Sequence, residues 1–180
     1  MIDLRTKGLP DTINVQGSPF LIHTDFRLWL KIAQAVKDNS LDENMLEDVF
    51  ISEIPLVDYS QELIDFLMCP NEVPKQFDNE SNQLIDYIID GEIIVSSFMQ
   101  VYKIDLTEVD MHWHLFKALL ANLPDGCKLT EVIGHRTWKK SNKKEETVRR
   151  ELKQMWELPV AQLEDEEDLI EEVNNEFYNC

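Results

Sequence analysis

Two histidines separated by one tryptophan, with a cysteine and a third histidine after them, are the residues most suggestive of chemistry. His112 and His114 are followed by Cys127 and His135. Imidazole and thiolate groups are zinc ligands, but a site needs three or four that converge. If residues 112–114 are helical, side chains two positions apart point about 200° away from each other. The two histidines then cannot share one ion, so we expect no metal site and no cofactor, and interpret them as surface and boundary residues.

Cys127 and His135 could also be a nucleophile and its base. Such a pair requires an oriented base and an oxyanion site, and the sequence indicates neither, so we interpret Cys127 as a structural thiol. The 35 Asp and Glu residues could supply an acid–base pair, but among so many carboxylates chance pairing is expected. We predict that the protein is not an enzyme.

A basic stretch between Arg136 and Lys153 holds eight basic and three acidic residues, in a chain whose net charge is −18. Its simplest interpretation is a solvated helix face, with Glu and Lys or Arg spaced to pair. Pairing with the chain's own acidic tail, or with an acidic segment of a partner, ranks second, and nucleic-acid binding ranks last. The negative net charge opposes binding to nucleic acid and to anionic membranes, so we expect neither as a partner.

Apolar spacing predicts a mainly α, helical bundle-like fold that would position these residues. Residues 12–15 and 19–22 flank a glycine-containing turn and predict a small N-terminal β-hairpin. Helical periodicity and capping residues then predict a series of helices. They are expected after the caps Thr24 or Asp25, between a 40–43 capping box and Pro55, from Asp58 or Ser60 to Pro70, over 84–89, over 92–103, from an Asp105 cap to Leu123, over 129–134 and over 144–157.

The domain organisation that we predict is one helical domain over residues 1–159, including the hairpin, and an acidic tail over 160–180. The tail has eight acidic and no basic residues, and we expect it to be flexible or to dock on a partner. The three cysteines are far apart in sequence and indicate no disulfide framework or zinc site. The N-terminus lacks the apolar core of a signal peptide, and no apolar run reaches the roughly 20 residues of a membrane span. A cytoplasmic location is therefore expected.

A series of short motifs resembles one phage family in order and spacing. The motifs are DFRLWL at 25–30, F-x3-Y-x2-DLTE at 98–108, HW-x2-FKAL at 112–119, LP at 123–124 and IGHR at 133–136. Together they resemble the bacteriophage gene-product-fifteen family of Gram-positive siphophages and prophages, over roughly residues 9–158. Members usually carry Gly at the position of Lys103, and the acidic tail lies outside the resemblance.

The resemblance implies a role in tail assembly, because genes of this family usually lie between those of the major tail protein and the tape-measure protein. The implied role is a chaperone that coats the tape-measure protein and helps to recruit major tail protein in the host cytoplasm, and that is absent from the finished tail. The alternative is a structural virion component, such as a tail-completion or head–tail connector protein. A homo-oligomer is possible in either role. Apparent exposure and amphipathicity place the partner-binding surface at Arg27, Trp29, Lys31, Met111, His114, Lys117, Arg149 and Trp156.

Overall fold

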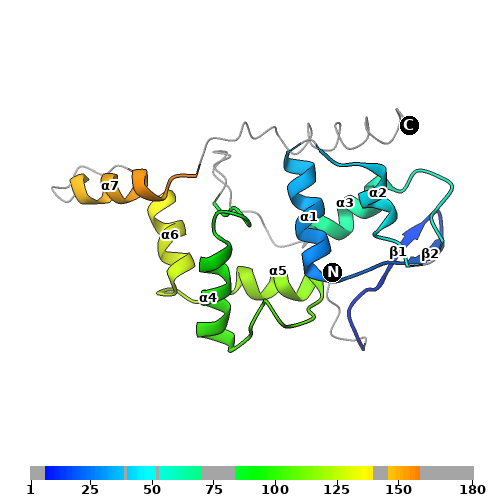
Figure 1. Cartoon of the computed structure of the whole chain (residues 1–180), viewed down its shortest axis with the longest axis horizontal. Helices are drawn as coiled ribbons and strands as arrows, with labels where there is room; N and C mark the ends of the chain where they lie inside the picture. Colours follow the sequence, from blue (N-terminus) through cyan, green and yellow to red (C-terminus); the bar gives the residue numbers. More distant parts are fainter. Residues whose placement is uncertain (1–6, 39, 52, 70–83, 140–145, 159–180) are drawn as a thin grey trace. The chain divides into compact units, whose positions relative to one another are not determined.

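The structure is a computed structural model that describes residues 7–38, 40–51, 53–69, 84–139 and 146–158 (Figure 1). The predicted mainly α fold with a small hairpin is confirmed, whereas the predicted acidic tail lies outside the described residues. The elements are β1 (Thr12–Val15), β2 (Ser18–Leu21), α1 (Phe26–Lys37), α2 (Glu43–Glu47), α3 (Ser60–Met68), α4 (Gly91–Tyr102), α5 (Trp113–Ala121), α6 (Lys128–Arg136) and α7 (Glu146–Trp156).

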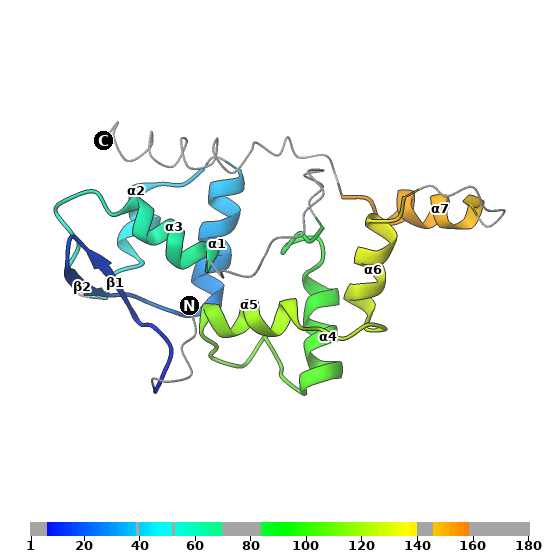
Figure 2. The same ribbon diagram turned by 180° about the vertical axis from the view of Figure 1, so that it is seen from behind.

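The described residues fall into two compact units, both inside the predicted range 1–159. The first unit holds the described residues up to 69 together with 110–118, and the second holds 84–109 and 119–158. The first therefore contains the hairpin, α1 to α3 and most of α5, and the second contains α4, the end of α5, α6 and α7 (Figures 1 and 2).

The hairpin of the first unit is a two-stranded antiparallel sheet in which Ile13 pairs with Phe20. Gln16 and Gly17 both have positive φ, 48° and 88°, as a two-residue turn that matches the strand twist requires. Two strands are marginal by themselves. The hairpin gains support because Ile13 and Val15 are buried and because Ile22, just after β2, forms a bridge with Phe50.

Helix α1 forms as predicted, with Asp25 as its N-cap. The Asp25 carboxylate accepts a hydrogen bond of 2.9 Å from the Arg27 backbone N–H, which satisfies one of the donors that a helix start leaves free. The buried face consists of Phe26, Trp29, Ile32 and Ala35. The Trp29 ring packs on Phe66 at 4.5 Å between centroids, so α1 holds α3 in the core of the first unit.

The second helix differs from its prediction at both ends. Its N-cap is Asp42, whose carboxylate accepts from the Met45 N–H at 2.8 Å, and not the predicted Ser40. It ends at Glu47 instead of continuing toward Pro55. The physical reason is competition from the hairpin, because the Val49 carbonyl accepts from the His23 N–H at 2.8 Å and the Ile51 N–H donates to the Leu21 carbonyl at 3.1 Å.

In the second unit, residues 84–89 are not helical and a turn covers residues 87–90, so the predicted helix there is wrong. The Asp86 carboxylate accepts 2.9 Å hydrogen bonds from the N–H groups of Ile88 and Ile89, an Asx-type arrangement that competes with helix formation. Helix α4 follows as predicted and buries Ile94, Ser97 and Phe98. It ends at Tyr102, and its C-cap Lys103 has a left-handed φ of 60°, a conformation that glycine adopts more readily than other residues.

Asp105 caps a turn rather than the predicted helix. Its carboxylate accepts from the Thr107 N–H at 2.9 Å and from the Thr107 hydroxyl, and α5 begins only at Trp113. Met111 and His112 are not helical because the chain pairs here with the residues before α1. The Phe26 N–H donates to the Met111 carbonyl at 2.9 Å, and the Trp113 N–H donates to the Thr24 carbonyl at 2.7 Å.

Candidate interaction surface

Side chains of α5 satisfy the carbonyl groups that α3 leaves free at its C-terminal end. Trp113 Nε1 donates to the Leu67 carbonyl at 2.9 Å and His114 Nε2 lies 3.0 Å from the Phe66 carbonyl oxygen. Lys117 Nζ donates to the carbonyls of Leu67 and Met68 at 3.1 and 2.8 Å. A cation at this end also complements the helix dipole. The HW-x2-FKAL motif therefore has a structural role in the first unit.

Hydrogen bonding and burial together determine the protonation states of His112 and His114. His112 Nδ1 accepts from the His114 backbone N–H at 3.0 Å, so its Nε2 carries the hydrogen that it donates to the Pro10 carbonyl at 2.8 Å. His114 is 4% exposed, and its Nδ1 has no hydrogen-bond partner among the described residues. Burial lowers the pKa of His112, and it lowers the pKa of His114 from 6.5 to about 4. Both rings are therefore neutral near pH 7.

The geometric argument against a shared metal ion at these histidines is wrong. His112 precedes α5 and is extended, so its ring lies 5.1 Å from that of His114 between centroids. The ring nitrogens are instead engaged with backbone groups, except His114 Nδ1. In the described ranges, no group of three or more His, Cys, Asp or Glu side chains is arranged to hold a metal ion.

Cys127 and His135 are not brought together. Cys127 is buried as the N-cap of α6, and His135 lies eight residues further on, a rise of roughly 12 Å along a helix. Burial acts to raise the pKa of the Cys127 thiol, but hydrogen bonds involving Thr130, Ser97 and the Leu129 backbone outweigh it and leave the pKa below its ordinary value. The thiol is enclosed at the start of a helix.

Three of the residues expected on the partner-binding surface are buried, so the expectation that they are exposed is wrong. Trp29 is 0% exposed, His114 4% and Met111 6%. Their apolar surface is used within the first unit, where Trp29 packs on Phe66. An apolar helix face in a sequence cannot distinguish a residue that meets a partner from one that fills the core.

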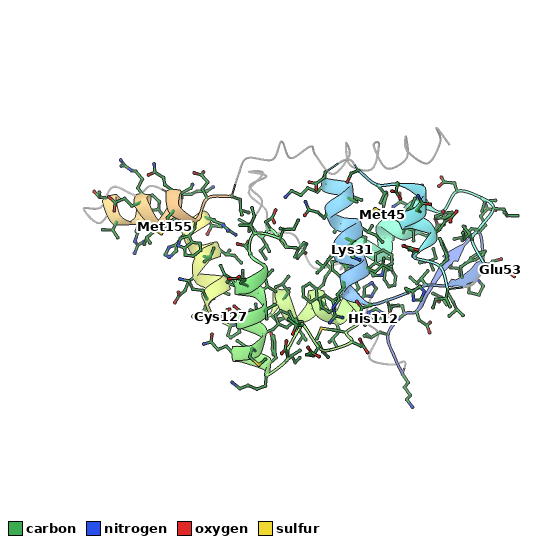
Figure 3. The ribbon with its side chains drawn as sticks, viewed as in Figure 1. Lys31, Met45, Glu53, His112, Cys127 and Met155 are labelled. Carbon is green, nitrogen blue, oxygen red and sulfur yellow. The ribbon has the colours of Figure 1, made fainter. Side chains whose placement is uncertain are left out.

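The other expected surface residues retain some access to solvent. Lys31 is exposed, whereas Arg27 and Lys117 are half-buried and engaged within the first unit. Figure 3 labels Lys31 on α1. In the second unit, Arg149 is exposed and Trp156 is half-exposed, with Lys128 Nζ lying 5.0 Å from the Trp156 ring centroid.

Sequence reasoning missed a run of exposed apolar side chains between α2 and α3. This 51–57 patch comprises Ile51 (52% exposed), Ile54 (38%), Leu56 (102%) and Val57 (43%), with Leu21 (45%) of β2 beside it. Figure 3 labels Glu53 of this segment near the hairpin. Acidic residues flank the patch: Glu47, Asp48, Glu53 and Asp58. Exposed apolar side chains gathered in one segment and rimmed by charge are typical of an interaction site.

Sequence reasoning also missed a buried ion pair that organises the second unit. Arg136 and Asp90 form a bidentate pair, with Nη1 to Oδ2 at 2.7 Å and Nη2 to Oδ1 at 2.8 Å. Their side chains are 6% and 1% exposed. Arg136 also donates to the Leu84 carbonyl and to the Trp156 carbonyl, each at 2.7 Å. One guanidinium therefore ties α6 to the turn before α4 and to the end of α7.

Comparison with known proteins gives a family match, which covers both units of the chain. The family model described as Bacteriophage Gp15 protein matches residues 6–158, which includes both units and the whole range that the motifs indicate. Searches of curated proteins and of solved structures gave no match. No helix among the described residues is long and apolar enough to cross a membrane.

Proposed function

Because the chain belongs to the bacteriophage Gp15 protein family, a family of virion-related phage proteins, we propose that it is a tail-assembly chaperone. In this proposal it binds the tape-measure protein in the host cytoplasm and helps to recruit major tail protein. It then leaves, so that it is absent from the mature virion. Membership of the family supports the phage setting of this role, and the exposed 51–57 patch supports a binding role.

The observation that supports a binding role best is the 51–57 patch. Leu56 is fully exposed and Ile51 is 52% exposed, although the same unit buries other apolar residues in a core around Trp29. Tape-measure proteins are long and prone to form coiled coils, so their unassembled helices present apolar stripes to water. An exposed aliphatic segment of this kind can cover part of such a stripe.

The charge of the chain suits a protein that keeps another soluble. A net charge of −18 makes copies bound along one partner repel each other and repel other complexes, which opposes aggregation. It also favours basic segments of partners during encounter. A short patch supplies only a small interface, and small interfaces release their partners readily. Release is required if major tail protein is to replace the chaperone.

The composition of purified phage particles tests the proposal against a structural role. We expect quantitative mass spectrometry to detect the protein in lysates of infected cells and to find far less than one copy per particle in purified virions. The major tail protein in the same samples is the internal control. A fixed, stoichiometric number of copies per particle would contradict the chaperone role and would favour the tail-completion or connector alternative.

A further inference from the structure

Helices α6 and α7 enclose a groove in the second unit. Its volume is about 450 Å³, and its lining residues come from the end of α6, the residue two positions after it and the first half of α7. The lining consists of Gly134, His135, Trp138, Val148, Arg149 and Leu152. Gly134 adds no side chain, and Trp138, Val148 and Leu152 supply apolar surface, so the groove can receive apolar side chains from an added segment.

Helix α7 extends this apolar surface beyond the groove. Val148, Leu152 and Met155 are spaced i, i+4 and i+7, which places them on one face of the helix. Val148 is 64% exposed and Met155 is 71% exposed, and Figure 3 labels Met155 on α7. Helix α7 is held in the second unit by contacts such as the hydrogen bond from Arg136 to the Trp156 carbonyl. Its apolar stripe is nevertheless largely exposed.

Basic side chains border the same stripe. Arg149 is exposed and follows Val148, and Lys153 follows Leu152, so both basic residues lie on one side of the stripe. In a chain of net charge −18 this is a local reversal of sign. A segment that complements both the apolar stripe and its border must carry aliphatic or aromatic residues at helical spacing together with several carboxylates.

We propose that the acidic C-terminal segment of this same chain, residues 160–180, binds this α6–α7 groove. Its sequence has eight acidic and no basic residues. Its apolar residues Ile170, Val173 and Phe177 are spaced i, i+3 and i+7, the spacing of a helix that inserts one face into a groove. The inference does not depend on the proposed tail-assembly role.

The connection between groove and segment favours this occupant over a separate partner. Val148 lies eight residues before Trp156, or roughly 12 Å along α7. Residues 157–169, which connect Trp156 to Ile170, can span up to about 40 Å when extended, so the segment reaches back without strain. Direct tethering also gives an effective concentration on the order of millimolar, which compensates for the weakness of screened surface charges.

Hydrogen exchange of the full-length chain tests the inference. In a tail-neutralised variant the eight carboxylates of 160–180 are replaced by amides, Glu→Gln and Asp→Asn. We expect the backbone amides of α7 to exchange about tenfold faster than in the wild type, which corresponds to about 1.4 kcal/mol of lost protection. The amides of α4 serve as an internal reference and keep their rates. Replacing Glu47, Asp48 and Glu53 by amides is the control for neutralising carboxylates elsewhere on the chain and should leave α7 unaffected.

A second test reverses the charge first on α7 and then on the C-terminal segment. Arg149→Glu should accelerate exchange in α7 as tail neutralisation does, whereas Arg150→Glu, on the opposite face of the helix, should not. Replacing the tail carboxylates by lysine in the Arg149→Glu background should restore slow exchange. Unchanged α7 exchange in the tail-neutralised variant overturns the inference. Protection that disappears on dilution also overturns it, because the occupant would then be a second copy of the chain.

Discussion

Arg136→Met should lower the free energy of unfolding of the second unit by about 3–5 kcal/mol. The substitution leaves the Asp90 carboxylate, 1% exposed, without the guanidinium that now binds both of its oxygens. It also removes the donors to the carbonyls of Leu84 and Trp156. Urea denaturation followed by circular dichroism measures the loss, and hydrogen exchange assigns it to α4, α6 and α7.

Lys128→Met is the matched control, because it removes a cation from the same helix. Lys128 lies 3.7 Å from Glu131, and their side chains are 49% and 52% exposed. Exposed pairs of this kind contribute at most about 1 kcal/mol. If the two substitutions destabilised the chain equally, the Asp90–Arg136 pair would not organise the second unit. The double variant Asp90→Leu, Arg136→Met should lose less than the sum of the single variants, because it leaves no unpaired charge.

Acidification should weaken the first unit through His114. Its pKa of about 4 in the folded chain lies below the ordinary 6.5, so the unfolded chain binds more protons between these two values. The free energy of unfolding contributed by this group is therefore fully present above pH 6.5 and is lost as the pH falls toward 4. A difference of this size corresponds to about 3 kcal/mol. The cause is burial, reinforced by the nearby His112 and Lys117.

The measurement is the difference in unfolding free energy between wild type and His114→Gln across this pH range. Many carboxylates also titrate near the lower end of this pH range. Their contribution is the same in both proteins, so it cancels when the two unfolding free energies are subtracted. The wild type should lose stability relative to the variant as the pH falls, while the exposed His23→Gln retains the wild-type dependence. If the unfolding free energies of wild type and His114→Gln changed in parallel with pH, protonation of His114 would not destabilise the folded chain, which would contradict this prediction.

Local signals are sufficient to predict α1 and α4. At α1, an N-capping Asp25 precedes apolar residues at helical spacing, and those same residues form the buried face. At α4, apolar residues occupy most positions between Gly91 and Tyr102. In both helices, periodicity and burial favour the same conformation, so no tertiary contact has to be known in advance.

Long-range backbone pairing explains where prediction fails. Met111 and His112 lie within the helix that the sequence predicts from the Asp105 cap onward, yet the chain there pairs with residues 24–26. Residues 49–51 likewise continue the apolar pattern of α2 but bond to the chain at 21–23. These partners are far away in sequence, so local periodicity carries no information about them. The first pairing brings the rings of His112 and His114 together, and the second leaves the 51–57 patch exposed.

The Asp90–Arg136 pair is unpredictable for a different reason. With 35 acidic residues in the chain, the partner of one arginine is not identifiable from residue type alone. Arg136 belongs to both the IGHR motif and the basic stretch, and the charge of that stretch favours a position near solvent. Only the structure shows that Arg136 is buried and identifies its carboxylate.

The central claim is that this chain binds the tape-measure protein, and the soluble fraction of that protein on co-expression tests it most directly. We predict that the wild-type chain raises the soluble fraction and co-purifies with the tape-measure protein. Leu56→Asp, in the 51–57 patch, should lose most of this effect, whereas Ile88→Asp, at a position 71% exposed in the second unit, should retain it. An unchanged soluble fraction with no complex in the presence of the wild-type chain would contradict the claim.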